Sequence, residues 1–240
     1  MSERPRETPK PTERPVRAAR AVEFPDGGCA RTRAALAAGR RWWLVLAAAV
    51  VLALLSLASI VAGASRLAAE AQGLLTAGRV VSEVLNAGVL WAGLPVLSGW
   101  LVRRPAHGVL AGVVASLTAL VVHYGAGQML GVFASSIWGQ NAGWFAIAAL
   151  TGGPLGAVGA IARRRGPWGL LARLTVPVGA VLEPFVLGVF TVPQHLPRLE
   201  RVSGVVSGLV LVAAGVAGVL AVAVERARSG RDDERSRGCS

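Results

Sequence analysis

The chain has 240 residues, of which 53% are hydrophobic, and its mean hydropathy is +0.55. A water-soluble domain of this length does not need so much apolar surface. The formal net charge of +12 comes largely from arginines that flank apolar blocks or lie in the tails, and no basic groove interleaved with aromatic residues is visible, so these features exclude a nucleic-acid-binding protein and indicate a membrane protein.

The apolar residues fall in blocks of about 20, the length that a helix needs to cross the hydrocarbon layer. Ala, Gly and Val dominate the blocks, which is typical of membrane helices, and the alternation that membrane strands require is absent. We therefore predict an all-α fold, a polytopic membrane bundle of six transmembrane helices. The predicted spans are residues 42–64, 81–102, 108–128, 142–162, 168–190 and 202–224.

The polar segments outside these spans have different compositions. Residues 1–41 form a basic arm in which prolines stand among Arg, Glu and Thr, and residues 225–240 form a charged tail, so both are predicted to be disordered. Within the arm, residues 30–41 are either a short basic helix on the membrane surface or a solvated linker. Residues 65–80 have the pattern of an amphipathic helix that lies on the outer surface or extends the second span.

Arginine clusters predict the orientation of the spans. They occur before the first span, between the second and third, between the fourth and fifth, and after the sixth, whereas the intervening connections carry few arginines. Arginines concentrate on the cytoplasmic side of membranes, so we predict a cell-membrane protein with both termini cytoplasmic. Cys29 and Cys239 then lie on that side, where a disulfide is not expected. They have no CxxC or His partners, and we expect no metal site.

Three segments carry a resemblance to a known family. They are NAGVLWAGLPVLSGWLVRRPAHGVLAGVVASLTALVVHY, GWFAIAALTGGPLGAVGAIARR and GAVLEPF. The membrane part of the chain resembles a family of small multi-pass membrane proteins from high-GC bacteria, a domain of unknown function, and the resemblance implies no activity. Six short spans with a Gly- and Pro-rich fourth span are also similar to the substrate-binding membrane components of energy-coupling vitamin transporters, which implies solute binding.

Glu183 is the main candidate for a functional residue. An ionisable side chain within a span costs at least about 2.5–3.5 kcal/mol and usually faces the bundle interior or a wet cavity. Pro184 follows it and is expected to bend the helix, as at transporter sites near mid-membrane. The alternative is a Glu183 side chain that only bonds to a neighbouring helix or reaches water at the outer surface.

His123 is the expected partner of Glu183. Both residues lie in the outer half of spans that run outward, so at about 1.5 Å rise per residue they reach similar depths. A histidine beside a carboxylate would relay protons or bind a cationic group. In the alternative, His123 and Tyr124 are interface anchors that never meet Glu183.

Two further sets of residues complete the candidate list. Glu83 and Asn86 lie on the outer side and would complete the polar pocket, although polar residues are also ordinary at helix ends near water. Glycines that occur on the small-residue faces of the spans are predicted to pack helices closely. These helix-packing residues are Gly112, Gly152, Gly156, Gly204 and Gly208.

The sequence leaves two hypotheses for function. One is a small transporter or solute-binding membrane component with an outward-facing polar site. The other is a structural or partner-binding membrane protein without a small-molecule substrate. Because HExxH, GxSxG, paired Asp and Cys/His patterns are missing, we expect no catalytic residues, no enzyme activity and no cofactor. The expected partners are the lipid bilayer, a small solute, and another membrane protein or a second copy of the chain.

Overall fold

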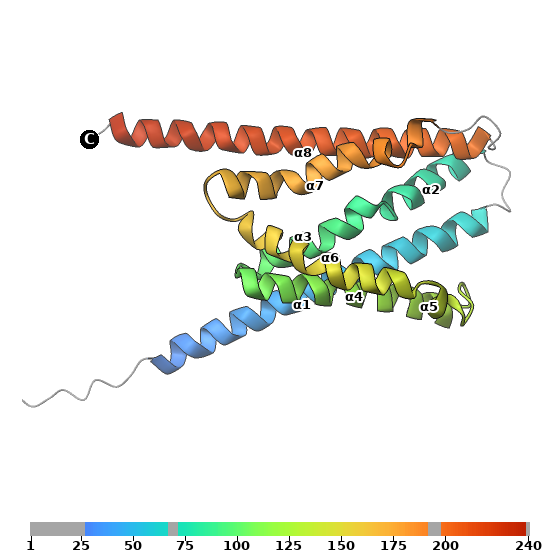
Figure 1. Cartoon of the computed structure of the whole chain (residues 1–240), viewed down its shortest axis with the longest axis horizontal. Coiled ribbons are helices and arrows are strands. Elements are labelled where there is room, and N and C mark those ends of the chain that lie inside the picture. Colours follow the sequence, from blue (N-terminus) through green and yellow to red (C-terminus); the bar gives the residue numbers. More distant parts are fainter. Residues whose placement is uncertain (1–26, 67–71, 192–197, 239–240) are drawn as a thin grey trace, which may run out of the picture. The chain divides into compact units, whose positions relative to one another are not determined.

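The computed structural model describes residues 27–66, 72–191 and 198–238, and it divides the chain into two units, residues 1–36 and 37–240 (Figure 1). In the first unit the described residues, 27–36, are helical. The all-α prediction is confirmed for the described residues, which contain helices and no strand. The elements are α1 (Gly27–Arg66), α2 (Gln72–Leu85), α3 (Gly88–Val102), α4 (Pro105–Met129), α5 (Ile137–Gln140), α6 (Ala142–Ile161), α7 (Pro167–Val186), η1 (Val189–Thr191) and α8 (Arg198–Gly238).

Several helices have the length and composition of membrane spans. Among the described residues five helices qualify singly, and the bent pair α2 and α3 makes a sixth when it is counted as one span. The five are Arg40–Ala62, Pro105–Met129, Ala142–Ile161, Pro167–Thr191 and Leu199–Ser229. Large apolar side chains such as Trp43, Leu150 and Val186 point outward. A surface of this kind is suited to lipid contact and is rare on water-soluble proteins, which supports a multi-pass membrane protein.

The second predicted span is broken. Instead of one helix over residues 81–102, α2 ends at Leu85, α3 begins at Gly88, and the two axes differ by 43°. The Asn86 side chain donates to the Ser82 carbonyl oxygen over 2.8 Å, a local bond by which Asn competes with helix continuation. Because α2 begins at Gln72, residues 72–80 extend this span, one of the two predicted alternatives, whereas residues 65 and 66 belong to the end of α1.

The tails also differ from the prediction. Residues 27–41 belong to α1, which continues into the first span, so residues 30–41 are helical, while residues 1–26 lie outside the described part. At the other end α8 runs to Gly238, through the tail predicted to be disordered, and residues 239–240 lie outside the described part. The reason is that extending a helix already formed by an apolar span costs little, and Glu, Arg and Ala are good helix formers.

Glycines bring the backbones of α3, α4 and α6 into contact. A Cβ atom on Gly112 would overlap the carbonyl oxygen of Gly152, and one on Gly156 would overlap that of Gly108. One on Gly99 of α3 would also overlap the carbonyl oxygen of Gly156. The structure thus places the first three predicted packing glycines where two helix backbones meet, an approach that small residues allow.

The two predicted packing glycines of α8 have looser surroundings. Gly208 faces the side chains of Phe190 and Val189 in η1, and a Cβ atom on Gly204 would lie 3.8 Å from Val189. The close approach of α8 to α7 is at Gly215, where a Cβ atom would lie 2.6 Å from the Pro177 carbonyl oxygen. The close contact of α8 with α7 therefore lies about two turns beyond Gly208 and three beyond Gly204, the two glycines predicted to pack.

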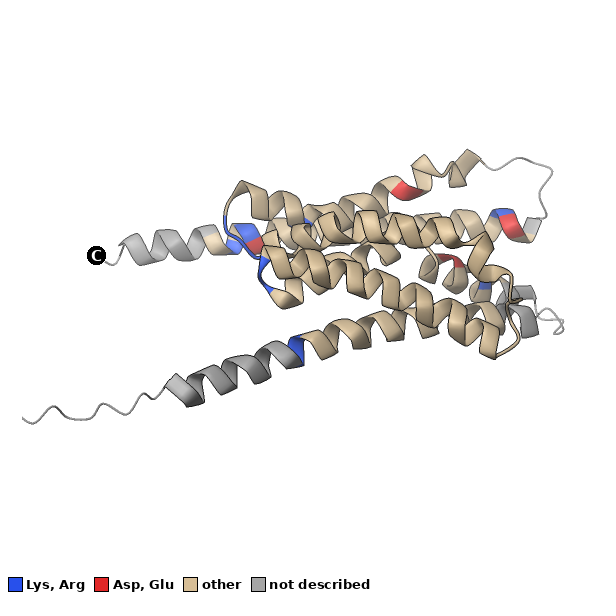
Figure 2. Cartoon of the chain, turned by 60° about the horizontal axis from the view of Figure 1, so that its bottom comes forward, with Lys and Arg blue, Asp and Glu red and all other residues tan. Residues whose placement is uncertain are grey.

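Two tight turns gather arginines at one end of the second unit. Arg103, in the left-handed region with φ 71°, ends α3 by donating its N–H to the Gly99 carbonyl oxygen, and Gly166 at φ 105° precedes α7. Figure 2 shows the Lys and Arg positions of these turns, in blue, at the same end. We call this the basic end, defined by the arginines at positions 40, 41, 103, 104, 163, 164 and 165.

The glycine contact predicts a difference between two variants of α6. Gly156→Ala should destabilise the bundle by about 1–3 kcal/mol, because the methyl group would overlap the Gly108 carbonyl oxygen. Gly143→Ala is the control, since its Cβ atom meets nothing within 4 Å and alanine favours helix. Thermal melting and gel filtration in detergent measure both. A Gly156→Ala protein that melts like the wild type and stays monodisperse would contradict the contact.

Candidate functional site

The break between α2 and α3 is capped by Glu183 of α7. The first N–H groups of a helix lack intrahelical partners, and Ala87, which precedes α3, has no polar side chain to supply one. Glu183 Oε1 accepts from the Gly88 N–H over 2.6 Å, and Oε2 accepts from the Val89 N–H over 2.7 Å. A carboxylate at a helix N-terminus is stabilised by these charged hydrogen bonds and by the helix dipole.

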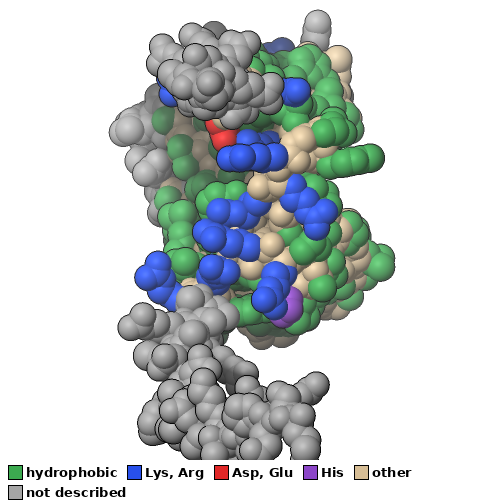
Figure 3. Space-filling model, turned by 90° about the vertical axis from the view of Figure 1, so that its left-hand side faces the viewer, with side chains coloured by type: hydrophobic (Ala, Val, Ile, Leu, Met, Phe, Trp, Pro, Cys, Tyr) green, Lys and Arg blue, Asp and Glu red, His purple; other side chains and the backbone are tan. Residues whose placement is uncertain are grey.

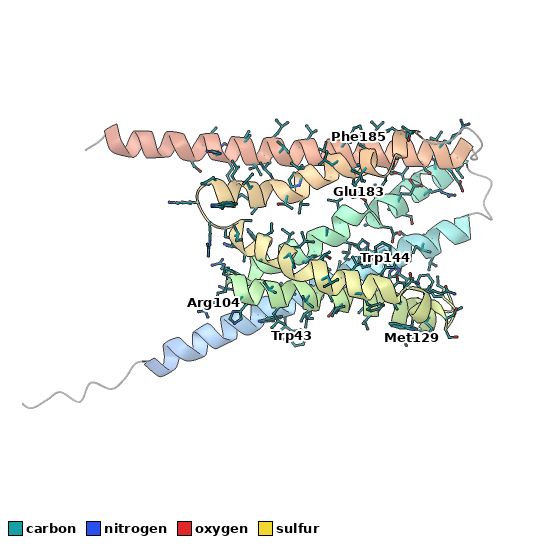
Figure 4. All side chains as sticks on the ribbon, in the orientation of Figure 1. Trp43, Arg104, Met129, Trp144, Glu183 and Phe185 are labelled. Atoms are coloured by element: carbon teal, nitrogen blue, oxygen red, sulfur yellow. The ribbon has the colours of Figure 1, made fainter. Side chains whose placement is uncertain are left out.

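The local structure of α7 positions this carboxylate. Pro184 is fully buried and cannot donate to the helix ladder, and α7 ends two residues later, at Val186, before Gly188 turns the chain at φ 64°. Gly88 leaves room for the approach, since a Cβ atom there would lie 3.3 Å from Glu183 Oε1. Figure 4 shows Glu183 beside the start of α3.

His123 has partners of its own. It is 7% exposed in α4, and its ring lies 5.6 Å from Trp91, 5.3 Å from Tyr124 and 5.5 Å from Phe133, between ring centroids. Its Nδ1 atom lies 3.4 Å from the Ala53 carbonyl oxygen, to which it donates in the Nδ1-protonated tautomer. The structure therefore does not form the His123–Glu183 pair on which a direct proton relay would depend.

One pocket collects part of the predicted polar set. It has a volume of about 380 Å³ between α3, α4 and α6, in the half of the bundle away from the basic end, and Asn86, His123 and Tyr124 line it. Its other polar or aromatic lining residues are Trp91, Ser116, Trp144 and Thr151, and Trp144 is labelled in Figure 4. We call it the aromatic pocket. None of its described lining residues carries a formal charge when His123 is neutral.

Glu183 lines a separate, smaller pocket. That cavity has a volume of about 270 Å³ and lies between α3, α6 and α7. The two pockets share Ala92 and Leu155 as wall residues. Gly88 provides the other link, because it lines the aromatic pocket while its N–H bonds to Glu183. Glu183 thus supports one edge of the aromatic pocket without facing into it.

Glu83 is directed toward α8. Its two carboxylate oxygens accept hydrogen bonds from Ser203 and Ser207, each over 2.8 Å. Arg79 lies 3.7 Å from Glu83 within α2, and its ion pair with Glu200, at 2.9 Å, joins α2 to α8. Glu83 therefore holds α2 against α8. Of the five predicted pocket residues, Asn86, His123 and Tyr124 line the aromatic pocket, Glu183 lines the smaller pocket, and Glu83 contacts α8.

Several residues of the site were not foreseen from the sequence. Ser56 of α1, which is fully buried, donates to the Asn86 side-chain oxygen over 2.6 Å. This hydrogen bond fixes the side chain of Asn86, which lines the aromatic pocket. Trp144 and Thr151 contribute walls from α6. The position of Trp91 could have indicated a pocket, because Trp91 lies deep in its predicted span, whereas most of the other tryptophans lie at predicted membrane interfaces. Ser56, a serine in an Ala- and Leu-rich span, has no feature in the sequence that would predict its role.

The described residues contain no cluster of His, Cys, Asp and Glu with the make-up of a metal site. Comparison with protein-family models, with curated proteins and with solved structures finds no match to the chain. The resemblance to a family of small membrane proteins therefore stays a prediction, and function has to be argued from the geometry of the site.

The capping role of Glu183 predicts a specific loss of stability. Glu183→Gln keeps one acceptor oxygen but places an NH₂ group against a backbone N–H, which should cost on the order of 1–2 kcal/mol. Glu200→Gln is the control, because it removes a partly exposed ion pair, typically worth about 0–1 kcal/mol. Thermal melting of both variants in detergent is the measurement. Equal melting temperatures for Glu183→Gln and Glu200→Gln would contradict the capping role of Glu183.

Proposed function

We propose that the protein is a small transporter, or a solute-binding component of a membrane system, with its site in the aromatic pocket. The pocket itself carries the proposal. Its volume of about 380 Å³ falls within the roughly 300–1,000 Å³ typical of small-molecule sites. It also has their composition, in which aromatic walls surround a few convergent polar groups.

The lining favours an uncharged, partly apolar solute. Trp91 and Trp144 offer flat apolar surfaces, while Asn86, His123 and Tyr124 offer hydrogen bonds. Burying a charged group without an opposite charge is costly, and none of the described lining residues carries a permanent charge. A compact molecule with a ring and two or three polar groups fits this chemistry.

The broken span supports a transport role in particular. Discontinuous helices near the middle of the membrane form binding sites in many transporters, because they present backbone groups and allow one segment to move against another. Here Asn86, at the break, lines the pocket, and Gly88, the first residue of α3, does so as well. The Glu183 cap stabilises this start of α3, and its release would free α3 to move.

A structural or partner-binding role is the second candidate. The observation that favours it is the Glu183 carboxylate, which is satisfied by two backbone N–H groups and so has a sufficient structural purpose. In this alternative the aromatic pocket is a packing defect or is filled by lipid. A membrane-protein partner or a second copy of the chain would then cover part of the apolar surface.

We further propose six spans with both termini cytoplasmic in the cell membrane. This count takes α2 and α3 as one broken span, and an even count leaves the two termini on the same side. The support for the orientation is the basic end, since arginines concentrate in cytoplasmic loops. The aromatic pocket would then lie in the outer half of the membrane.

A solute screen by thermal shift tests the proposed function. A compound that raises the melting temperature of the wild type should lose most of its effect in Thr151→Leu, which fills the pocket, and in His123→Phe, which removes the ring nitrogens. Glu183→Gln is the control. It should lower the melting temperature of the ligand-free protein but keep the increase that the ligand causes, because Glu183 lies outside the aromatic pocket. A broad library of uncharged solutes without any stabilising compound would favour the structural alternative.

Cysteine labelling tests the orientation. Cys29 and Cys239 should resist a membrane-impermeant maleimide in intact cells and react after permeabilisation. Ser135→Cys, in an exposed position between α4 and α5, should react in intact cells when it is placed in a chain without the two native cysteines. Labelling of either native cysteine in intact cells would contradict the proposed cytoplasmic position of that terminus.

A further inference from the structure

An open groove lies at the basic end, separate from the aromatic pocket. It has a volume of about 610 Å³ and is bounded by α3, the turn after α6, α7 and α8. Its mouth carries Trp100, Arg163 and the Arg173–Glu225 ion pair, and its remaining walls are apolar or glycine. Those remaining residues are Gly93, Val96, Leu97, Ala162, Ala172, Val176 and Val222. The groove is thus cationic at its mouth and apolar along its length.

The two arginines at the mouth are held in place and keep donors available. Arg163 stacks on the Trp100 ring at 4.4 Å, and its Nη1 donates to the Trp100 carbonyl oxygen over 3.3 Å. Arg173 donates from Nε to the Ala162 carbonyl oxygen over 2.7 Å and from Nη1 to Glu225 over 3.0 Å. Each guanidinium has five N–H donors, so Nη2 of both is left for a ligand.

The positive charge around the mouth is not balanced by the one carboxylate. Glu225 is 61% exposed and offsets only one of the two groove arginines. Desolvation, followed by the positive charges of Arg103 and Arg41, lowers the pKa of Arg163 below its ordinary value. Figure 3 looks onto this end and shows basic side chains set among apolar ones. An anion at the mouth would relieve this repulsion.

We propose that the groove binds one anionic glycerophospholipid, with its phosphate against Arg163 and Arg173 and an acyl chain along α3 and α7. Basic pockets between membrane helices on the cytoplasmic side suit such headgroups. The apolar length of the groove favours a lipid over free phosphate, because a small anion would leave Val96, Leu97 and Val176 uncovered. Arginine also binds phosphate with two parallel hydrogen bonds, which suits it to this role.

Native mass spectrometry of the detergent-purified protein tests the proposal. With equal amounts of phosphatidylglycerol and phosphatidylcholine of the same chain length, the wild type should retain the anionic lipid about fivefold more often. Arg163→Gln and Arg173→Gln should each reduce that preference by about fivefold. Gly93→Leu should weaken the retention of both lipids without a change in charge, since its Cβ atom faces the groove with only Val176 nearby, at 3.8 Å.

Controls separate the groove from a diffuse positive surface. Arg104→Gln removes an exposed arginine of the same end that does not line the groove, and it should leave the preference unchanged. Millimolar inorganic phosphate should fail to displace the bound lipid. Phosphatidylethanolamine is the most demanding comparison, because its ammonium group would be attracted to Glu225 while its phosphate contacts the arginines. It should still bind less than phosphatidylglycerol. Equal retention of the anionic and zwitterionic lipids, an equal loss in Arg104→Gln, or displacement by phosphate would each overturn the proposal.

Discussion

The structure depends on satisfying the backbone N–H groups at a helix terminus in the middle of an apolar span that is long enough to cross a membrane. Hydrocarbon offers no water to bond backbone groups, so a break within a span must find its partners in the protein. At the break after Leu85, Glu183 accepts hydrogen bonds from Gly88 and Val89, the first two residues of α3. This explains how an ionisable side chain and an interrupted helix, each unfavourable alone, are stable together. It also fixes α7 beside α3.

The size of side chains decides where space is left in the bundle. At the α3–α4–α6 contact, glycines let the backbones touch. Further from the basic end the same three helices carry Trp91, Tyr124 and Trp144, which hold them apart and line the aromatic pocket. Close packing near the basic end and aromatic side chains further from it therefore leave a cavity in the half of the bundle away from the basic end. This cavity is the feature on which the proposed solute binding rests.

Composition and periodicity were enough to predict helices, apolar blocks and arginine-rich turns, because each depends on residues close in sequence. The partners of polar residues were not predictable. Glu183 stands out in its span, but the N–H groups it bonds lie 95 and 94 residues away. Similarly, Glu83 is satisfied by two serines of α8, more than 100 residues later. Such pairings depend on helix rotation and order, which no local pattern encodes.

Hydrogen exchange at the start of α3 tests the central claim most directly. Mass spectrometry of the protein in lipid nanodiscs should show Gly88 and Val89 protected in the wild type. In Glu183→Gln their exchange should be faster by about tenfold or more, the effect of a local opening that costs less free energy. Exchange along the middle of α4 should not change. Fast exchange at Gly88 and Val89 in the wild type, or the same rate in both proteins, would contradict the account.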